Sequence, residues 1–362
     1  MRVALIHDWL TGFRGGEKVL EALCELYPDA TIFTMVHIPD STSPVIESHP
    51  IRTAFTQRFP AVKSIYRWYL PIYPWAVESL DLDGYDLVIS SSHCVAKGVI
   101  TPPDSMHICY CHTPMRYVWD RFGDYFGNGV KARLIYGPVA HYLRKWDVAS
   151  AARVDHFIAN SKHVAGRIQK YYGREAEVIY PPVDTDVYVP TDEAPEDYYL
   201  IVSALVPYKR LDLAIDAFNK RSEPLLIVGT GPQEAKLKAR AGRNIRFLGG
   251  LSQRELRPLY QRCQAALLPG VEDFGIVPVE ALACGRPVVA FAEGGALESV
   301  RDGETGVFFS ESSPKALSDA IDRVSSLRFN RQAIRSWALG FSRQHFKDRI
   351  RAYIDEKLAL PS

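Results

Sequence analysis

The sequence has 362 residues, of which 47% are hydrophobic and 23% are charged. That length exceeds what one ordinary core requires and suits two α/β domains. The 43 Lys and Arg residues nearly balance the 42 Asp and Glu residues, so the overall charge does not predict a nucleic-acid partner.

Two features of the sequence bear on its compartment. The opening residues reach the polar pair His7 and Asp8 too early for a secretory signal, and no apolar run approaches the ~20 residues that span a bilayer. The six cysteines are scattered, and Cys109 and Cys111 are spaced neither like a CxxC redox pair nor like a zinc site. We therefore expect a cytoplasmic protein with free thiols.

The first half alternates short β-branched runs with helical stretches, which predicts a parallel sheet wrapped by helices. Tandem prolines at 181 and 182 cannot continue a central strand, and an acidic stretch with prolines at both ends follows at 190–195. We place the domain boundary between them, with residues 1–185 as the first domain. Its expected strands are 3–6, 31–33, 87–90, 107–109, 156–159 and 177–180.

The same alternation restarts after this boundary and predicts a second domain over residues 186–343. In doubly wound sheets, ligands bind beyond the carboxyl ends of the strands, and a cleft between domains is a common ligand site. The amphipathic segment 344–358 is expected to cap one of the domains, with the first as one candidate. The expected second-domain strands are 199–202, 225–228, 245–248, 265–268 and 287–290, with a helix at 211–218.

The strongest local motif is the stretch 267–285, in which a buried strand leads through a loop into a helix. Pro278 is expected at the first helical position, where its missing N–H has no cost. Gly275 lets the backbone approach a ligand closely. The amides of residues 275–279 and the helix dipole then form an anion site suited to a diphosphate.

Two glutamates flank this anion site. We expect Glu280 in the first helical turn, where its carboxylate can accept hydrogen bonds from a ribose diol, and Glu272 within reach of the hydroxyls of a sugar. The alternative is that Glu280 only complements the helix dipole, a contribution of about 0.3–1 kcal/mol.

Glu272 and Glu280 resemble the E-x7-E signature of retaining glycosyltransferase family 4, and the resemblance extends over nearly the whole chain. It implies that Glu272 contacts the donor sugar and that Glu280 binds the ribose. It also implies that the loop amides of Phe274, Gly275 and Ile276 hold the phosphates.

The resemblance implies the α/β fold called GT-B, in which two doubly wound Rossmann-like domains face a central cleft. In that arrangement residues 1–185 form the acceptor-side domain and residues 186–343 bind the nucleotide sugar.

Lys209 lies in the stretch 202–212, between an expected strand and an expected helix. A lysine at such a turn is a good point charge for phosphate, although a Lys-Arg pair is otherwise usually solvated surface. The family pairs this lysine with an arginine five positions earlier, where this sequence has Ala204. Arg210 and Arg14 are the candidates to replace that arginine.

Two glycine-containing loops, 229–232 and 249–251, end the next two strands of the second domain. Alone they indicate only turns. In the resembled family such loops line the nucleobase pocket, so Gly231 and Leu251 are the candidates for the base site.

In the first domain, Gly15 and Gly16 belong to a loop after the first expected strand and are candidates for donor binding. Their spacing does not match a dinucleotide fingerprint. In the family, a glycine-rich loop here approaches the donor phosphate and the acceptor.

His112 directly follows an expected strand. A lone histidine is usually structural, but in the family the histidine at this position hydrogen-bonds the donor sugar near the reacting carbon. His112 therefore joins Glu272 and Lys209 as a catalytic candidate, and Ser161 and Lys162 resemble another pair that lines the family's cleft.

The strings 206–210 (VPYKR) and 7–10 (HDWL) resemble most closely those of bacterial mannosyltransferases of O-antigen and exopolysaccharide assembly. This resemblance implies a hexosyltransferase that moves mannose from GDP-mannose to a glycan or lipid-linked glycan, with UDP-sugars left open as donors. No acidic cluster is convincing as a magnesium site, so we expect no metal and no cofactor beyond the sugar nucleotide. Because no carboxylate nucleophile of the kind that retaining glycosidases use can be singled out, front-face displacement is the expected mechanism.

Three alternatives remain open. One is a sugar-nucleotide epimerase of the same fold, and another is a non-catalytic subunit that binds nucleotide or glycan. The third concerns the cationic segment 131–174 and the aromatic segment 66–75. These are either ordinary surface and core, or they dock the protein on anionic lipid at the inner face of the cell membrane.

Overall fold

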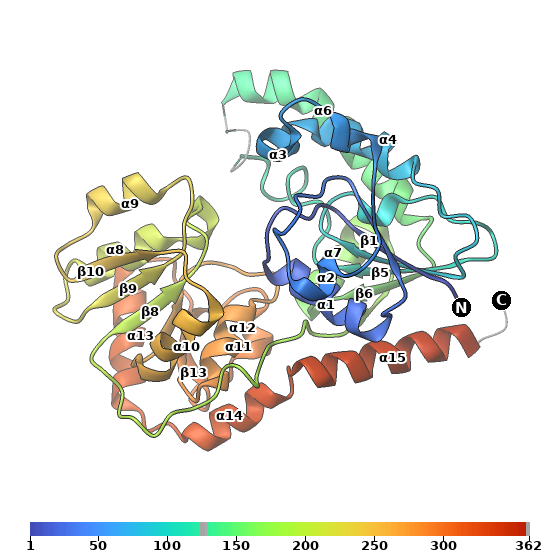
Figure 1. Ribbon diagram of the computed structural model, residues 1–362. Helices are drawn as coiled ribbons and strands as arrows, with labels where there is room; N and C mark the ends of the chain where they lie inside the picture. Colours follow the sequence, from blue (N-terminus) through green and yellow to red (C-terminus); the bar gives the residue numbers. More distant parts are fainter. Residues whose placement is uncertain (124–126, 128, 360–362) are drawn as a thin grey trace. The chain divides into compact units, whose positions relative to one another are not determined.

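The computed structural model describes residues 1–123, 127 and 129–359. The chain divides into two compact units. Unit 1 contains Met1–Pro181 and Phe346–Ser362, and unit 2 contains Pro182–His345. Each unit has one sheet of parallel strands with helices packed on it (Figure 1).

The sheet of unit 1 has seven strands in the order β3-β2-β1-β4-β5-β6-β7. The strands are β1 (Val3–His7), β2 (Thr31–Thr34), β3 (Ile51–Thr53), β4 (Leu87–Ser92), β5 (Met106–Cys111), β6 (His156–Ala159) and β7 (Ala176–Val178). The helices are α1 (Gly15–Leu26), α2 (Pro44–Glu47), α3 (Val62–Ile65), α4 (Tyr73–Glu78), α6 (Val130–Ala151), α7 (Lys162–Tyr172) and α15 (Arg343–Ala359), with 3-10 turns η1 (Phe55–Arg58), η2 (Tyr66–Ile72) and η3 (Ala96–Gly98).

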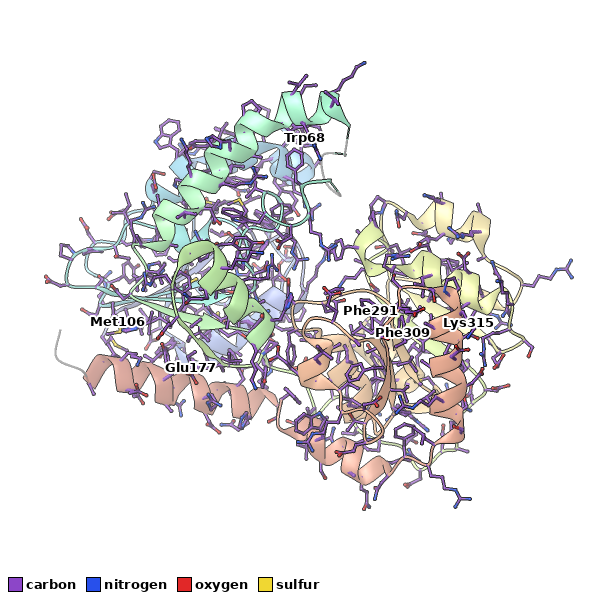
Figure 2. The ribbon with its side chains drawn as sticks, turned by 180° about the vertical axis from the view of Figure 1, so that it is seen from behind. Trp68, Met106, Glu177, Phe291, Phe309 and Lys315 are labelled. Carbon is purple, nitrogen blue, oxygen red and sulfur yellow. The ribbon has the colours of Figure 1, made fainter. Side chains whose placement is uncertain are left out.

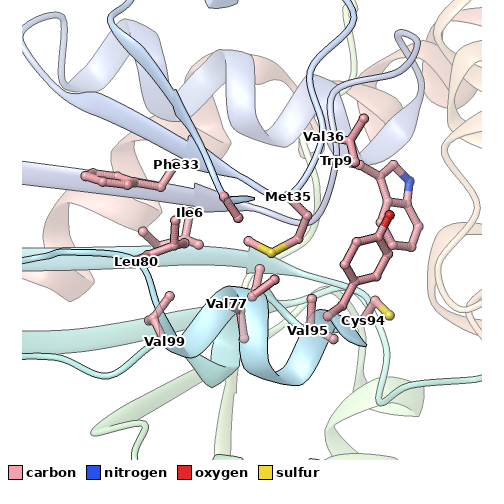
Figure 3. Close-up of a cluster of buried hydrophobic side chains, with 14 of the residues drawn as sticks. Ile6, Trp9, Phe33, Met35, Val36, Val77, Leu80, Cys94, Val95 and Val99 are labelled. Atoms are coloured by element: carbon pink, nitrogen blue, oxygen red, sulfur yellow. The ribbon is translucent and has the colours of Figure 1, made fainter. Parts of the chain in front are cut away.

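The central strands of unit 1 are buried on both faces, which explains why they read as continuous apolar runs. One face packs against α4, η3 and α6 through a core that includes Ile6, Met35 and Val77 (Figure 3). The other face packs against α1 and α15 through a second core that includes Leu5 and Leu20.

Helix α15 begins in unit 2 and continues along unit 1 as the long red helix of Figure 1. Phe346, Ile350 and Ile354 are spaced by four residues, so they share one helix face, and each is only 1% exposed. Together they complete the second core of unit 1. The amphipathic segment expected to cap a domain therefore supplies core residues to unit 1.

The sheet of unit 2 has six strands in the order β10-β9-β8-β11-β12-β13. They are β8 (Tyr199–Val202), β9 (Leu225–Val228), β10 (Ile245–Gly249), β11 (Ala266–Leu268), β12 (Val288–Phe291) and β13 (Gly306–Phe309). The helices are η4 (Pro207–Lys209), α8 (Leu211–Phe218), α9 (Glu234–Arg240), α10 (Gln253–Arg262), α11 (Ile276–Ala283), α12 (Ala296–Ser299), α13 (Pro314–Ser326) and α14 (Arg331–Leu339).

One face of the unit 2 sheet is covered by α8, α9 and α13 through a core that includes Ile201, Leu267 and Ile321. On the other side α11 contacts β11, β12 and α14. Phe291 and Phe309, at the ends of neighbouring strands, have ring centroids 5.4 Å apart (Figure 2).

The expected strands form in both halves, and the expected helix 211–218 is α8. Two strands were not expected: β3, which has three residues at the sheet edge, and β13. The strand expected at 177–180 was placed too late, because β7 already ends at Val178 and Ile179 is not in a strand.

Both sheets reverse their strand order at the first strand of the unit. In unit 1 the pair β1 and β4 lies at this reversal, and in unit 2 the pair β8 and β11 does so. The loops after two such strands run to opposite sides of the sheet, which is where doubly wound folds bind ligands. The fold thus singles out the loops after these four strands.

Candidate functional site

In unit 2, the loops after β8 and β11 meet at this reversal. Lys209 ends the short turn η4, and its Nζ donates a hydrogen bond to Glu272 Oε1. Their side chains are 15% and 18% exposed, so solvent screens this ion pair only in part. The two charges that the sequence predicted at the site are therefore paired with each other in this structure.

Glycines allow the loops after β8, β11 and β12 to approach one another closely. A Cβ at Gly270 would lie 2.5 Å from the carbonyl oxygen of Tyr208 and 2.7 Å from Cα of Lys209. A Cβ at Gly295 would lie 2.2 Å from Cα of Phe274, while the amide of Gly295 donates to the carbonyl of Glu272 at 2.9 Å. Backbone contacts thus hold the Glu272 loop on both sides.

Helix α11 follows this loop and begins at Ile276, with Gly275 as its N-cap at φ +83°. The prediction that Pro278 occupies the first helical position is wrong, because Pro278 is the third helical residue. Proline has no N–H, so the backbone donors that the helix start leaves without a helical partner are those of Gly275, Ile276 and Val277. The sequence had predicted free backbone donors from residues 275 to 279, so the set of donors is smaller than expected.

The prediction that Glu280 lies in the first turn of α11 is wrong, because Glu280 is the fifth residue of that helix. It is 4% exposed, and its Oε2 accepts a hydrogen bond of 2.9 Å from the hydroxyl of Tyr260. Burial raises the pKa of Tyr260 well above its ordinary value, and the negative charge of Glu280 raises it further. Tyr260 thus remains a donor that orients the Glu280 carboxylate.

The two expected base-site residues lie in neighbouring loops of unit 2. A Cβ at Gly231 would lie 2.5 Å from the carbonyl oxygen of Leu205, so this glycine permits close packing of the loops after β8 and β9. Leu251 is half-buried just before α10.

Arg210, one of the two candidates for the missing arginine, bonds residues outside the Lys209–Glu272 pair. Arg210 has a left-handed backbone at φ +54°, and its guanidinium bonds Asp212 at 3.1 Å and Ser312 at 2.6 Å. Ala204 and Arg14 are both exposed. The replacement therefore stays a prediction.

In unit 1, Asp8, directly after β1, organises the loop after β4, a role that the sequence analysis did not predict. Its carboxylate accepts hydrogen bonds of 2.6–3.0 Å from four consecutive backbone amides, those of residues 93–96, and lies 2.9 Å from Nδ1 of His93. Burial alone would raise the pKa of Asp8, but the charge and hydrogen bonds of His93 hold it well below the ordinary value.

His112 directly follows β5 and lies against the glycine-rich start of α1. A Cβ at Gly16 would lie 3.5 Å from Cε1 of His7 and 3.8 Å from Nε2 of His112. Gly15 is the first residue of that helix. Unit 1 therefore brings its predicted residues Gly15, Gly16 and His112 together, and it adds His7, which was not predicted.

The loop after β6 also reaches His112. Asn160 Nδ2 donates to the carbonyl oxygen of His112 at 3.0 Å, and Ser161 caps α7 by accepting from the amide of Val164 at 3.0 Å. Ser161 was among the residues that the family resemblance indicated, whereas Asn160 becomes relevant only once the strand order is known.

Across the described residues, no cluster of three or more His, Cys, Asp or Glu side chains has a geometry that could hold a metal ion. Among the helices that the structure describes, none is both long and apolar enough to cross a membrane. All six cysteines are unpaired and buried, which confirms the expected free thiols.

The architecture of two parallel-sheet Rossmann-like units, with polar sites at the strand-order reversals, defines the GT-B fold. Residues 13–187 match the model for Glycosyltransferase Family 4, and residues 190–338 match the model for Glycosyl transferases group 1. The chain belongs to this GT-B glycosyltransferase superfamily.

Curated relatives match parts of the chain. An uncharacterized glycosyltransferase of Methanocaldococcus jannaschii is 30% identical over 172 residues, which cover 46% of this chain and 48% of the relative. The D-inositol 3-phosphate glycosyltransferase of Mycobacterium tuberculosis is 31% identical over 198 residues, which cover 48% of this chain and 41% of the relative. The chain thus spans about half the length of the curated relatives that it matches.

Solved structures resemble the whole chain in fold. Sucrose-phosphate synthase from Thermosynechococcus elongatus superposes with a TM-score of 0.73 at 18% identity, covering 99% of this chain and 100% of that chain. HepE of Anabaena in complex with UDP superposes with a TM-score of 0.69, also at 18% identity, covering 98% and 100%.

Proposed function

We propose that this protein is a hexosyltransferase that uses a nucleoside diphosphate sugar as its donor. One observation carries the proposal: Lys209, Glu272 and the start of α11 meet at the strand-order reversal of unit 2. A compact cation next to unpaired backbone donors is a site for a diphosphate, and an adjacent carboxylate suits a sugar hydroxyl.

Each residue of this site then has a separate role in binding the donor. Lys209 and the amides of Phe274, Gly275 and Ile276 hold the diphosphate and stabilise its charge as it leaves. Glu272 exchanges part of its contact with Lys209 for hydroxyls of the sugar. Glu280, oriented by Tyr260, accepts hydrogen bonds from the ribose.

Three further residues of unit 2 complete the proposed donor site. Gly231 and Leu251 line the base site, and Arg210 supplies the second cation for the phosphates.

In unit 1, His112 hydrogen-bonds the sugar near its reacting carbon, while Gly15 and Gly16 approach the donor phosphate. We also propose that residues 1–185 serve the acceptor and residues 186–343 the nucleotide sugar.

The reaction that fits these groups is transfer with retention of configuration and without a metal ion. The bond between C1 and the phosphate oxygen breaks, and its electron pair stays with the diphosphate. The acceptor hydroxyl oxygen bonds to C1 on the same face, and its proton passes to the departing phosphate. Release of the α-linked product from an α-linked donor supports this mechanism, and an inverted product contradicts it.

Two donor classes have separate support. The sequence resemblance to mannosyltransferases favours GDP-mannose, with a glycan or lipid-linked glycan as acceptor. The second candidate, a UDP-sugar, is favoured by the complexes of the structural relative HepE with UDP and with UDP-glucose.

Calorimetric titration of the full chain with GDP, UDP and ADP separates these donors. A dissociation constant at least about tenfold lower for one nucleotide identifies the base, because tenfold corresponds to ~1.4 kcal/mol of selective contact. Glu280→Gln serves as the site variant and should weaken binding of the preferred nucleotide. If none of the three nucleotides binds, the proposed function is wrong.

The proposed lipid-linked acceptor agrees with an exposed surface of unit 1. Trp68 and Trp75 are 72% and 67% exposed, and Leu134 and Ile135 on α6 are 72% and 66% exposed. Figure 2 shows Trp68 at the end of unit 1 where α6 begins. The same two segments of the chain also carry exposed cationic side chains, which include Arg67, Lys131, Arg133 and Lys145.

This composition suits anionic lipid headgroups, so we propose docking at the inner face of the cell membrane. In sedimentation assays, the protein should bind vesicles that contain phosphatidylglycerol and not pure phosphatidylcholine vesicles. The variant Lys131→Glu with Arg133→Glu should reduce this binding, since each cation contributes about 1 kcal/mol. Lys315→Glu on α13 is the control. Equal binding by both variants contradicts the proposal.

A further inference from the structure

Behind His112, a row of polar side chains runs from β5 to the start of α1. Nε2 of His112 lies 2.8 Å from Oγ of Ser91, and the same Oγ lies 3.1 Å from Nδ1 of His7. On the far side of His7, its Nε2 lies 3.8 Å from Oε1 of Glu17. The row therefore reads Glu17, His7, Ser91, His112.

The fold holds this row in place. His7 and Ser91 are direct partners in the register of β1 and β4, so their side chains share one sheet face. The residues His7 and Ser91 are fully buried, and the side chain of Glu17 is 11% exposed. Water therefore has little access to this part of the row.

The protons in the row are constrained by the single hydrogen of the Ser91 hydroxyl. That hydroxyl can donate to one ring nitrogen, and it accepts from the other only if that nitrogen carries a proton. When both hydrogen bonds form, Nδ1 of His7 and Nε2 of His112 must therefore be in opposite protonation states. The tautomer of one imidazole sets the tautomer of the other.

Two arrangements of protons are possible, with the proton of His7 on Nδ1 or on Nε2, and Glu17 favours one of them. Its other oxygen, Oε2, accepts from the amide of Arg14 at 2.9 Å. The carboxylate is thus negative and fixed, and a negative charge beside Nε2 of His7 favours the proton on that nitrogen.

The arrangement of the whole row follows. With its single proton on Nε2, His7 accepts the Ser91 hydrogen at Nδ1, and Ser91 in turn accepts from Nε2–H of His112. We propose that Glu17, His7 and Ser91 are positioning residues that fix His112 in its Nε2–H tautomer. In that tautomer Nδ1 of His112 carries no proton, so it can accept a hydrogen bond from a hydroxyl of the donor sugar. The contact with the sugar rests on the proposed function, whereas the tautomer does not.

The neighbouring residue on β4 offers a matched control. Ser90 points to the opposite face of the sheet, and its Oγ lies 2.8 Å from Nε2 of His107. Ser90 and Ser91 are both 0% exposed. Ser90→Ala therefore removes a buried serine–histidine hydrogen bond of the same kind, outside the row.

Side-chain nitrogen NMR of the full chain with labelled histidine tests the tautomer directly and without any ligand. The His112 signals are assigned by their absence in His112→Asn. We expect the Nε2–H tautomer in the native protein and in Ser90→Ala, and a mixture of tautomers in Ser91→Ala and in Glu17→Gln. The proposal is overturned if His112 in Ser91→Ala keeps the native tautomer, or if the native protein has the Nδ1–H tautomer.

Steady-state kinetics with the donor identified by titration provide the second measurement. Ser91→Ala should lower kcat by about five- to tenfold, the effect of one hydrogen bond, while Ser90→Ala keeps the native kcat. Ser91→Thr retains the hydroxyl and should recover both the tautomer and most of the rate. If Ser90→Ala and Ser91→Ala lose the same activity, the row has only a structural role. A protein that transfers no sugar but has the expected tautomer contradicts the proposed function and leaves the row established.

Discussion

At the scale of single residues, the chemistry of unit 2 centres on a lysine and a glutamate that already neutralise each other. An isolated buried charge is costly, so this pairing keeps Lys209 and Glu272 stable next to the helix start. A bound diphosphate offers Lys209 more negative charge than one carboxylate does. In the proposed function, ligand binding therefore redistributes an existing ion pair, and each of the two charges keeps a partner of opposite charge or a hydrogen bond.

The first prediction concerns Lys209. Lys209→Ala should raise the dissociation constant of the preferred nucleoside diphosphate by about tenfold or more, because a hydrogen bond to a charged group contributes ~1.5–3 kcal/mol. Calorimetry measures the change. Lys315→Ala, which removes a lysine from an exposed pair on α13, should leave the constant unchanged. Native affinity in Lys209→Ala would remove this residue from the site.

The second prediction concerns Asp8 and acid stability. A carboxyl group whose pKa is lowered by folding stabilises the protein above its unfolded pKa of about 3.9. That contribution disappears as the pH falls towards the folded pKa. Asp8→Asn should lower the free energy of unfolding near neutral pH by at least about 2 kcal/mol.

Denaturant titrations across the acid range measure this effect of Asp8. The stability of Asp8→Asn should depend less on pH below about pH 4 than that of the native protein. Asp86→Asn, which changes an exposed carboxylate near the N-terminus, is the control. Parallel pH curves for the native protein and Asp8→Asn would contradict the interpretation.

At the scale of elements, the site depends on how closely the loops after β8 and β11 approach each other. Gly270 has Tyr208 and Lys209 backbone atoms where a Cβ would lie, and backbone cannot move aside as a flexible side chain can. The position of Lys209 is thus set by a glycine on a different loop.

The third prediction follows from this contact. Gly270→Ala should separate the two loops, weaken nucleotide binding and lower the stability of unit 2 by about 1–3 kcal/mol, the usual cost of overpacking. Calorimetry and thermal unfolding measure the two effects. Gly340→Ala is the control, because its backbone has φ −63° and its Cβ would meet its nearest neighbour at 3.4 Å. Tight binding by Gly270→Ala would show that the loops adapt.

Sequence patterns predicted most of the elements, since buried strands read as apolar runs. The edge strand β3 is only Ile51–Thr53 and is not fully buried, so it leaves no such run. The helix start at Ile276 was misjudged because Pro278 is tolerated anywhere in a first turn. That error placed Glu280 two residues too close to the start of the helix.

The row behind His112 could not be predicted from the sequence. Positions 7, 17, 91 and 112 form no motif, and His7, Ser91 and His112 meet because β4 lies between β1 and β5 in the sheet. The same holds for Tyr260, which reaches Glu280 from another helix. A sequence motif can identify functional residues that lie close together in the chain. Residues that support them from other strands or helices can be identified only when the strand order is known.

At the scale of the whole molecule, unit 1 is built from two distant parts of the chain. Its second core needs α15, whose buried residues follow the entire unit 2 in the sequence. The stability of unit 1 therefore depends on residues beyond position 345.

The fourth prediction tests this dependence. Ile350→Ala should destabilise unit 1 by about 2–5 kcal/mol, the usual cost of such a cavity. Hydrogen exchange should then accelerate in β1 and β4 while exchange in β11 keeps its native rate. Arg351→Ala, on the exposed face of the same helix, is the control. Equal acceleration in both units would mean that they unfold together.

The divided construction of unit 1 has a consequence during synthesis on the ribosome. The residues up to Pro181 emerge first, but the face that contains Leu5 and Ile32 is covered only in part, by α1, until α15 emerges. At ~5–20 residues per second, translation of the intervening unit takes roughly ten to thirty seconds. The domain that is made first is thus the last to be completed, and its apolar face is accessible to chaperones during that interval.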